Sequence, residues 1–206
     1  MTEEEWLGGC AWHEILGAYP IPLSPRKTRL WTLALCRWTP AETSDPEVIS
    51  ALSDIEDFID GRATRAVFEE ALHRASFSAY ESMYHDRVAI LAAEMDNEQL
   101  WTEPFAVLGD CVDGLTLNYN IPTTSLLRDI FGNPFRPVSF DRVWRTDTAV
   151  TLAQAMYESR DFSAMPILAD ALQDAGCDNA DILNHCRGPG PHVRGCWVVD
   201  LVLEKE

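Results

Sequence analysis

Apolar side chains recur every three to four residues along most of the chain, which is the spacing of an amphipathic α-helix. A clear case starts at Asp45-Pro46 and ends at Gly61, with an apolar stripe made of Val48, Ile49, Leu52, Ile55 and Ile59. A half-buried strand would instead alternate strictly between apolar and polar residues. No convincing run of that kind occurs, so the pattern predicts helices throughout.

Helix-start and helix-stop residues divide the chain into segments. Thr2 precedes three glutamates, and Ser24 precedes Pro25, which are both N-cap signals. Similar signals and terminating glycines or prolines predict further helices over 26–38, 46–60, 64–95 (one helix, or two with a break near 76–78), 103–118, 122–131, 147–159, 164–176 after a Ser163 cap, 182–187 after an Asp178–Asp181 capping box, and 196–203. The last segment is short enough to be a strand, and helix is preferred. Residues 133–145 form the one long predicted loop.

These elements predict an all-α protein, a single globular helical bundle of about eight to ten helices. Its 206 residues, 47% of them apolar, are enough for one sizeable core. An alternative division into two sub-bundles has its seam near 120–122. It separates an acidic helical part, residues 1–121, from a helical part with a Gly/Pro turn, residues 122–206. One continuous domain is the preferred interpretation.

The charge of the chain is strongly negative and unevenly distributed. The formal net charge is −17, and residues 39–122 hold 17 acidic and four basic side chains. Such a charge repels phosphate backbones and anionic membrane surfaces, so we expect no nucleic-acid or membrane partner. The chain start lacks the basic and apolar regions of a signal peptide, and the longest apolar run, Val88 to Ala93, is far shorter than a membrane span. We therefore expect a cytoplasmic protein.

Two regions of the sequence look familiar. At the N-terminal end they are the start Met1-Thr2-Glu3-Glu4-Glu5-Trp6-Leu7 and the segment 26–30. At the C-terminal end they are the segments 126–137 and 167–203, whose most specific part is the tail from His185-Cys186-Arg187-Gly188-Pro189-Gly190-Pro191-His192 to Asp200. In these residues the chain resembles a large family of bacterial proteins of unknown function. The resemblance implies a shared fold and carries no activity, because the family has none assigned.

The tail is also the first candidate site. Cys177, His185, His192 and Cys196 lie within twenty residues and offer the thiolate and imidazole ligands of a tetrahedral zinc site. Cys186 is adjacent to His185, so on a helix the two side chains diverge and at most one of them should bind the metal. The spacing lacks the short knuckles of known structural sites, so buried cysteines and satisfied histidines are the preferred interpretation, with no cofactor expected and zinc as the alternative.

The second candidate is an anion site around the same turn. Arg187, His192 and Arg194 bracket Gly188–Pro191, whose glycines allow a close backbone approach to a phosphate or carboxylate. The competing interpretation is a stiff structural turn with both arginines in internal contacts. A Cys186–His185 nucleophile is a third idea, but no known catalytic motif accompanies it, so the chain is not expected to be an enzyme.

The sequence thus predicts a non-enzymatic protein–protein interaction module whose acidic face recognises a basic protein partner. The alternative is a metal- or anion-binding domain with its site between Cys177 and Cys196. The oligomeric state stays open at this level.

Overall fold

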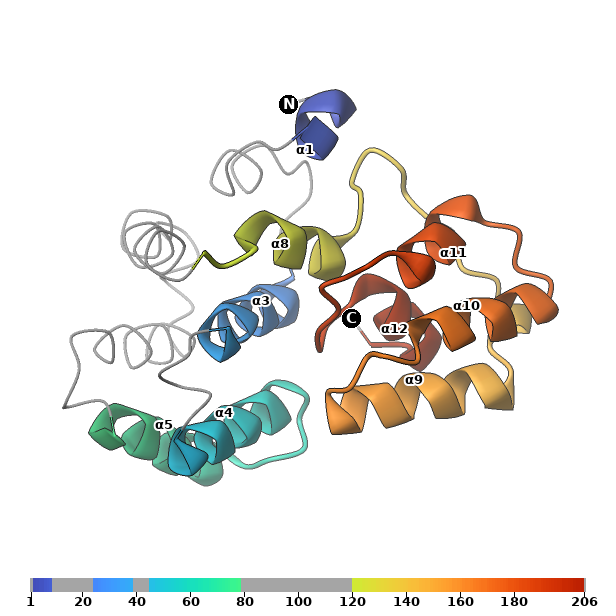
Figure 1. The fold of residues 1–206 in the computed structure, drawn as a ribbon. Helices are drawn as coiled ribbons and strands as arrows, with labels where there is room; N and C mark the ends of the chain where they lie inside the picture. The colour runs from blue at the N-terminus through green and yellow to red at the C-terminus, as the bar shows by residue number, and fades with distance from the viewer. Residues whose placement is uncertain (1, 9–23, 39–44, 79–119, 206) are drawn as a thin grey trace. The chain divides into compact units, whose positions relative to one another are not determined.

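Figure 1 shows the computed structural model, which describes residues 2–8, 24–38, 45–78 and 120–205. These residues form nine α-helices and one 3-10 helix and contain no strand, which confirms the all-α prediction. The elements are α1 (Glu3–Gly8), α3 (Pro25–Arg37), α4 (Pro46–Ile59), α5 (Arg65–Ser78), α8 (Thr123–Phe131), η3 (Arg142–Trp144), α9 (Asp147–Ser159), α10 (Met165–Asp174), α11 (Ala180–Arg187) and α12 (Trp197–Leu203).

The chain divides into two compact units. One unit is Thr28–Thr123, and the other joins Met1–Lys27 to Thr124–Glu206, so the boundaries fall inside α3 and at the start of α8. The division drawn from the sequence near residue 121 differs from this one, because it places residues 1–27 with the acidic part. We call the second unit the terminal unit, since it contains both ends of the chain.

A buried ion pair ties the start of α3 to the rest of the terminal unit. The Arg26 guanidinium donates to both oxygens of Asp200 on α12, at 2.7 and 3.3 Å, and to the Tyr157 hydroxyl on α9 at 2.7 Å. Next to it, the Lys27 ammonium donates to the Ile130 carbonyl at the end of α8. These contacts join residues more than a hundred positions apart and explain why the N-terminal segment belongs to this unit.

The core of the terminal unit lies between α9, α10, α11 and α12. In it α9 packs against α10 and α12, and α11 packs against α10 and α12. Apolar faces of the four helices meet there, and the loop residues Val138 and Phe140 cover part of it. The fully buried members include Ala149, Ala153, Tyr157, Leu168, Ala169, Leu172, Ile182, Cys186, Cys196, Val198, Val199 and Val202.

Helix α8 buries three apolar side chains together with one carboxylate. Leu126, Leu127 and Ile130 are fully buried, and Asp129 beside them is only 2% exposed. The helix stops at Gly132, which adopts φ +68°. A Cβ there would lie 3.2 Å from the Trp197 indole, so glycine is required both for the turn and for this contact.

In the other unit, α4 and α5 pack closely against each other. Phe58 and Phe68 stack with ring centroids 4.4 Å apart, and the Arg37 guanidinium at the end of α3 donates to Glu56 on α4 at 2.7 Å. Not every apolar residue of these two helices faces inward, and Ile49 of the predicted stripe is one that does not. Ile49 is 38% and Val67 40% exposed, because only part of each apolar stripe meets a neighbouring helix.

Most helix ends agree with the sequence signals, and two caps differ. Thr2 caps α1, Asp45 caps α4 and Thr146 caps α9, as expected. Helix α10 instead begins after Ala164 without a side-chain cap, so the Ser163 prediction is wrong. Asn179 rather than Asp178 caps α11, because its side-chain oxygen accepts from the amides of Asp181 and Ile182.

Several predictions cannot be compared with the structure. The predicted helix over 103–118 and the second half of the 64–95 segment lie outside the described residues, and the described part of that segment is α5. Helix α12 confirms that the last apolar run is helical rather than extended. None of the helices in the described ranges is long and apolar enough to cross a bilayer.

Candidate metal centre

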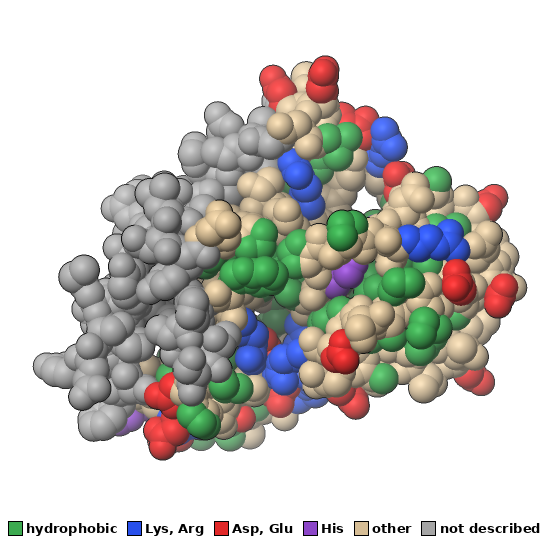
Figure 2. Space-filling view, viewed as in Figure 1, with side chains coloured by type: hydrophobic (Ala, Val, Ile, Leu, Met, Phe, Trp, Pro, Cys, Tyr) green, Lys and Arg blue, Asp and Glu red, His purple; other side chains and the backbone are tan. Residues whose placement is uncertain are grey.

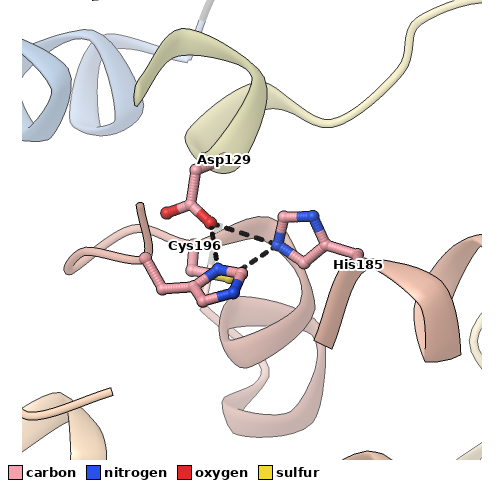
Figure 3. A group of neighbouring side chains, drawn as sticks. Asp129, His185 and Cys196 are labelled. Carbon is pink, nitrogen blue, oxygen red and sulfur yellow. Dashed lines mark hydrogen bonds and ion pairs between the residues drawn. The ribbon is translucent and has the colours of Figure 1, made fainter. Parts of the chain in front are cut away.

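Four side chains from four segments of the terminal unit converge on one point. Asp129 comes from α8, His185 from the last turn of α11, His192 from the turn after it, and Cys196 from the N-cap of α12. One ligand atom from each lies within 4.8 Å of every other. Figure 3 shows Asp129 reaching down from α8 toward His185 and Cys196.

The distances within this cluster are short. His192 Nδ1 lies 2.7 Å and His185 Nε2 3.1 Å from Asp129 Oδ1, and His185 Nε2 lies 3.2 Å from Cys196 Sγ. A tetrahedral zinc ion with bonds of about 2.0–2.3 Å sets its ligand atoms about 3.3–3.8 Å apart. These three separations are shorter than that range by less than about 1 Å, and the upper bound for the whole group, 4.8 Å, exceeds it by about 1 Å.

Backbone geometry orients the ligands. The Val193 amide donates to Asp129 Oδ2 at 2.9 Å, which leaves Oδ1 facing the two imidazoles. The Cys196 amide donates to the Val193 carbonyl at 2.9 Å and closes the turn between them. Gly190 adopts φ +81°, and a Cβ there would lie 3.1 Å from the backbone nitrogen of His192. Glycine at this position therefore allows the turn that places His192 in the cluster. Such supporting hydrogen bonds are typical of metal ligands.

The electrostatics of Asp129 follow from its two histidines. Burial alone would raise the pKa of its carboxyl, but hydrogen bonds from His185 and His192, together with their charge, lower that pKa below its usual value. The carboxylate is thus ionised although it is almost fully buried. A buried anion with nitrogen and sulfur ligands around it is an environment that favours a bound cation.

The same geometry argues against a cysteine nucleophile at this point. In a Cys–His–Asp relay, one imidazole nitrogen faces the sulfur and the other faces the carboxylate. Here His185 Nε2 alone faces both Cys196 Sγ and Asp129 Oδ1. Burial, aided by the nearby Asp129 charge, also raises the pKa of the Cys196 thiol well above its usual value, whereas a nucleophile needs a lowered one.

His192 carries an uncompensated cost in this position. Its Nε2 is buried and has no hydrogen-bond partner among the described residues. An unsatisfied buried polar group costs about 1–3 kcal/mol. A residue selected only for packing would avoid that cost, so the imidazole is better explained by what its Nδ1 does in the cluster.

The cluster contains His185, His192 and Cys196, three of the four residues named for the alternative zinc site in the sequence. The fourth, Cys177, lies in the helical core and is absent from the group. Cys186 is also buried in that core, where burial raises the pKa of its thiol to about 12. Of the adjacent pair 185–186, one residue therefore joins the cluster and the other packs in the core.

The three residues of the anion hypothesis have separate surroundings. The Arg187 guanidinium donates to Asp170 and Gln173 on α10, at 2.9 and 2.7 Å. Arg194 is buried, donates to the Tyr157 carbonyl at 2.7 Å and stacks over that ring. His192 belongs to the cluster with Asp129, so the two arginines do not join it at one pocket.

Asp129 is the member of the cluster that is absent from the sequence predictions. It lies 56 residues before His185 and on a different helix, with no spacing that relates the two. The available signal was an acid between Leu127 and Ile130, on the apolar face of a helix where an acid needs a partner.

Comparison with known proteins does not assign this chain to a family. No protein-family model, curated protein or solved structure matches this chain. The resemblance of the chain ends to a bacterial family of unknown function therefore stays a prediction, and the function has to be argued from the site.

Proposed function

We propose that this chain is a metal-binding protein and that the site of Asp129, His185, His192 and Cys196 holds a divalent transition metal, best matched by zinc. The observation that carries the proposal is the convergence of these four ligand atoms within 4.8 Å of one another. Thiolate and imidazole ligands favour zinc, cobalt or copper over magnesium and calcium, which take oxygen ligands.

The charges of the cluster fit a divalent ion. Binding to a metal requires the Cys196 thiol to lose its proton and both histidines to be neutral. The thiolate and the Asp129 carboxylate then carry two negative charges, which a divalent cation balances. A neutral site is what a position with a 2% exposed carboxylate and a fully buried sulfur requires.

The acidic interaction module has less support. Among the described acids of α4, Asp54, Glu56 and Asp57 form ion pairs with arginines of the same unit, as do Asp60 directly after α4 and Glu69 on α5. Many of the other acids lie in 79–119, outside the described residues. A basic protein partner stays a prediction of the sequence, as does the cytoplasmic location.

Elemental analysis and a competition titration with a chromophoric chelator test the metal proposal. We expect the purified full-length protein to bind one zinc ion per chain and to hold it against dialysis. Cys196→Ser should weaken zinc binding by at least ~10-fold, while Cys177→Ser, a matched change at a buried cysteine outside the cluster, should leave it unchanged. Zinc binding that is absent, or equally strong in Cys196→Ser, would refute the proposal.

A further inference from the structure

The candidate metal centre forms part of the wall of a pocket. A pocket of about 220 Å³ is lined by the ligand residues Asp129, His185 and His192 and by the turn Gly188–Pro191. On the face shown in Figure 2, histidine atoms reach the surface in the area between α8 and α11. The pocket is smaller than the roughly 300–1,000 Å³ of drug-sized ligand sites, so it suits a small ion or molecule.

The rest of the pocket wall carries hydrogen-bond donors. The lining residues Ser125, Arg128 and Asn184 have a hydroxyl, a guanidinium and an amide donor on their side chains. Ser125, Arg128 and Asp129 are three and four residues apart, so they share one face of α8. Asn184 adjoins His185 on α11. The three donor residues thus lie on the same two helices as the candidate ligands Asp129 and His185.

The sum of the charges around the pocket indicates that its ligand is an anion. A divalent metal, the Asp129 carboxylate and the Cys196 thiolate sum to zero, and among the described residues that line the pocket Asp129 is the only acid. Arg128 then gives the pocket a net positive charge. Its planar guanidinium matches the paired oxygens of a carboxylate or phosphate.

We propose that this pocket binds a small oxyanion, a phosphate or a carboxylate, which coordinates the metal while Arg128 and Asn184 donate to its remaining oxygens. The inference rests on the proposed function, because the metal supplies most of the positive charge. Zinc sites can accept a fifth ligand, so the anion can bind without displacing a protein ligand.

Cobalt-substituted protein provides the test, because the visible absorption of protein-bound Co²⁺ changes with its coordination. Inorganic phosphate and acetate are titrated separately. The anion whose spectral change saturates at the lower concentration shows whether the pocket prefers a phosphate or a carboxylate. Arg128→Gln should weaken that anion about 10- to 100-fold, as expected for the loss of a charge-assisted hydrogen bond. Arg142→Gln is the matched control, because it removes the same charge from a side chain that is 92% exposed and outside the pocket.

The possible results separate the two proposals. If cobalt does not bind, the metal proposal itself fails. If cobalt binds stoichiometrically and neither anion alters its spectrum, or if Arg142→Gln weakens the anion as much as Arg128→Gln, only the oxyanion proposal fails. Arg128 also donates to the Trp6 carbonyl, so its replacement can loosen α1. Asn184→Ala, at an exposed position, is therefore measured in parallel and should weaken the anion several-fold.

Discussion

Zinc should raise the thermal stability of the whole protein, and His192→Asn should abolish most of that effect. The four ligands come from α8, α11, the turn and the N-cap of α12, so the site is complete only when the terminal unit is folded. A ligand that binds only the native state stabilises it by about 2.7 kcal/mol at a free concentration 100-fold above its Kd. For a chain of this size that energy corresponds to a rise in Tm of about 5–11 °C.

The His192→Asn variant should reduce this stabilisation by zinc, and the size of the reduction follows from the loss of affinity. Even the loss of a residue that supports a ligand typically weakens metal binding about 10- to 100-fold, and the loss of the ligand His192 should weaken it at least as much. At the same zinc concentration, a 100-fold weaker site leaves about 0.4 kcal/mol of stabilisation, or a rise in Tm of about 1–2 °C. The asparagine keeps a polar side chain of similar reach at the buried position.

Differential scanning fluorimetry or calorimetry of each protein with zinc and with EDTA measures the effect. The difference between the two conditions removes any change that the substitution itself causes in the metal-free protein. His73→Asn is the control, since His73 is exposed on α5 in the other unit, and it should keep the full rise in Tm. No zinc-dependent rise in the wild type, or an equal rise in His192→Asn, would show that these side chains do not form a metal site.

Three further predictions concern the packing around the site. Arg26→Leu should cost about 3–5 kcal/mol in urea unfolding because it removes the guanidinium that donates to both oxygens of the Asp200 carboxylate, which is only 2% exposed. Arg65→Leu at an exposed ion pair should cost less than about 1 kcal/mol. Gly132→Ala should lower the urea midpoint by an amount equivalent to about 1–2 kcal/mol or more, because the residue has φ +68° and its Cβ would press on an indole. In the metal-free protein, the lowered pKa of Asp129 stabilises the native state. This contribution is complete above the unfolded-state pKa of about 4 and is lost as the pH falls through the lower native pKa. In pH-dependent unfolding, the difference in stability between wild type and Asp129→Asn should therefore shrink in that acid range.

The helices were predictable because their signals are local. Thr2, Asp45 and Thr146 each cap the helix that follows through a side-chain bond to an amide two or three residues away. The same local signals fix a start only to within a residue or two. Ala164 and Asn179, rather than their neighbours, therefore mark the starts of α10 and α11.

Burial was predictable only in part, because it depends on which neighbour each stripe meets. Val48 and Leu52 on α4 are buried, while Ile49 beside them is 38% exposed. On α5, Phe68 stacks on Phe58 and the adjacent Val67 faces outward. A stripe drawn from spacing alone is wider than the area that a neighbouring helix covers.

The candidate site shows the same limit more sharply. His185, His192 and Cys196 were selected because they are close in the sequence, and a turn of defined geometry brings them together. Proximity along the chain offered no reason to exclude Cys177, which packs in the core. It also gave no reason to include Asp129, whose place in the cluster depends on how α8 packs in the folded unit.

The contacts of Asp129 also bear on what kind of metal site this is. Structural zinc sites are built mostly from cysteines, and domains that depend on them unfold without the metal. Here the carboxylate already accepts hydrogen bonds from two imidazoles and from the Val193 amide, and the helices behind it form an extensive apolar core. Both features hold the ligands in place before a metal binds, so we expect the terminal unit to fold without it. Such a metal is not needed for folding and lies at the wall of a pocket that contains an arginine. We therefore expect it to bind a ligand rather than to hold helices together.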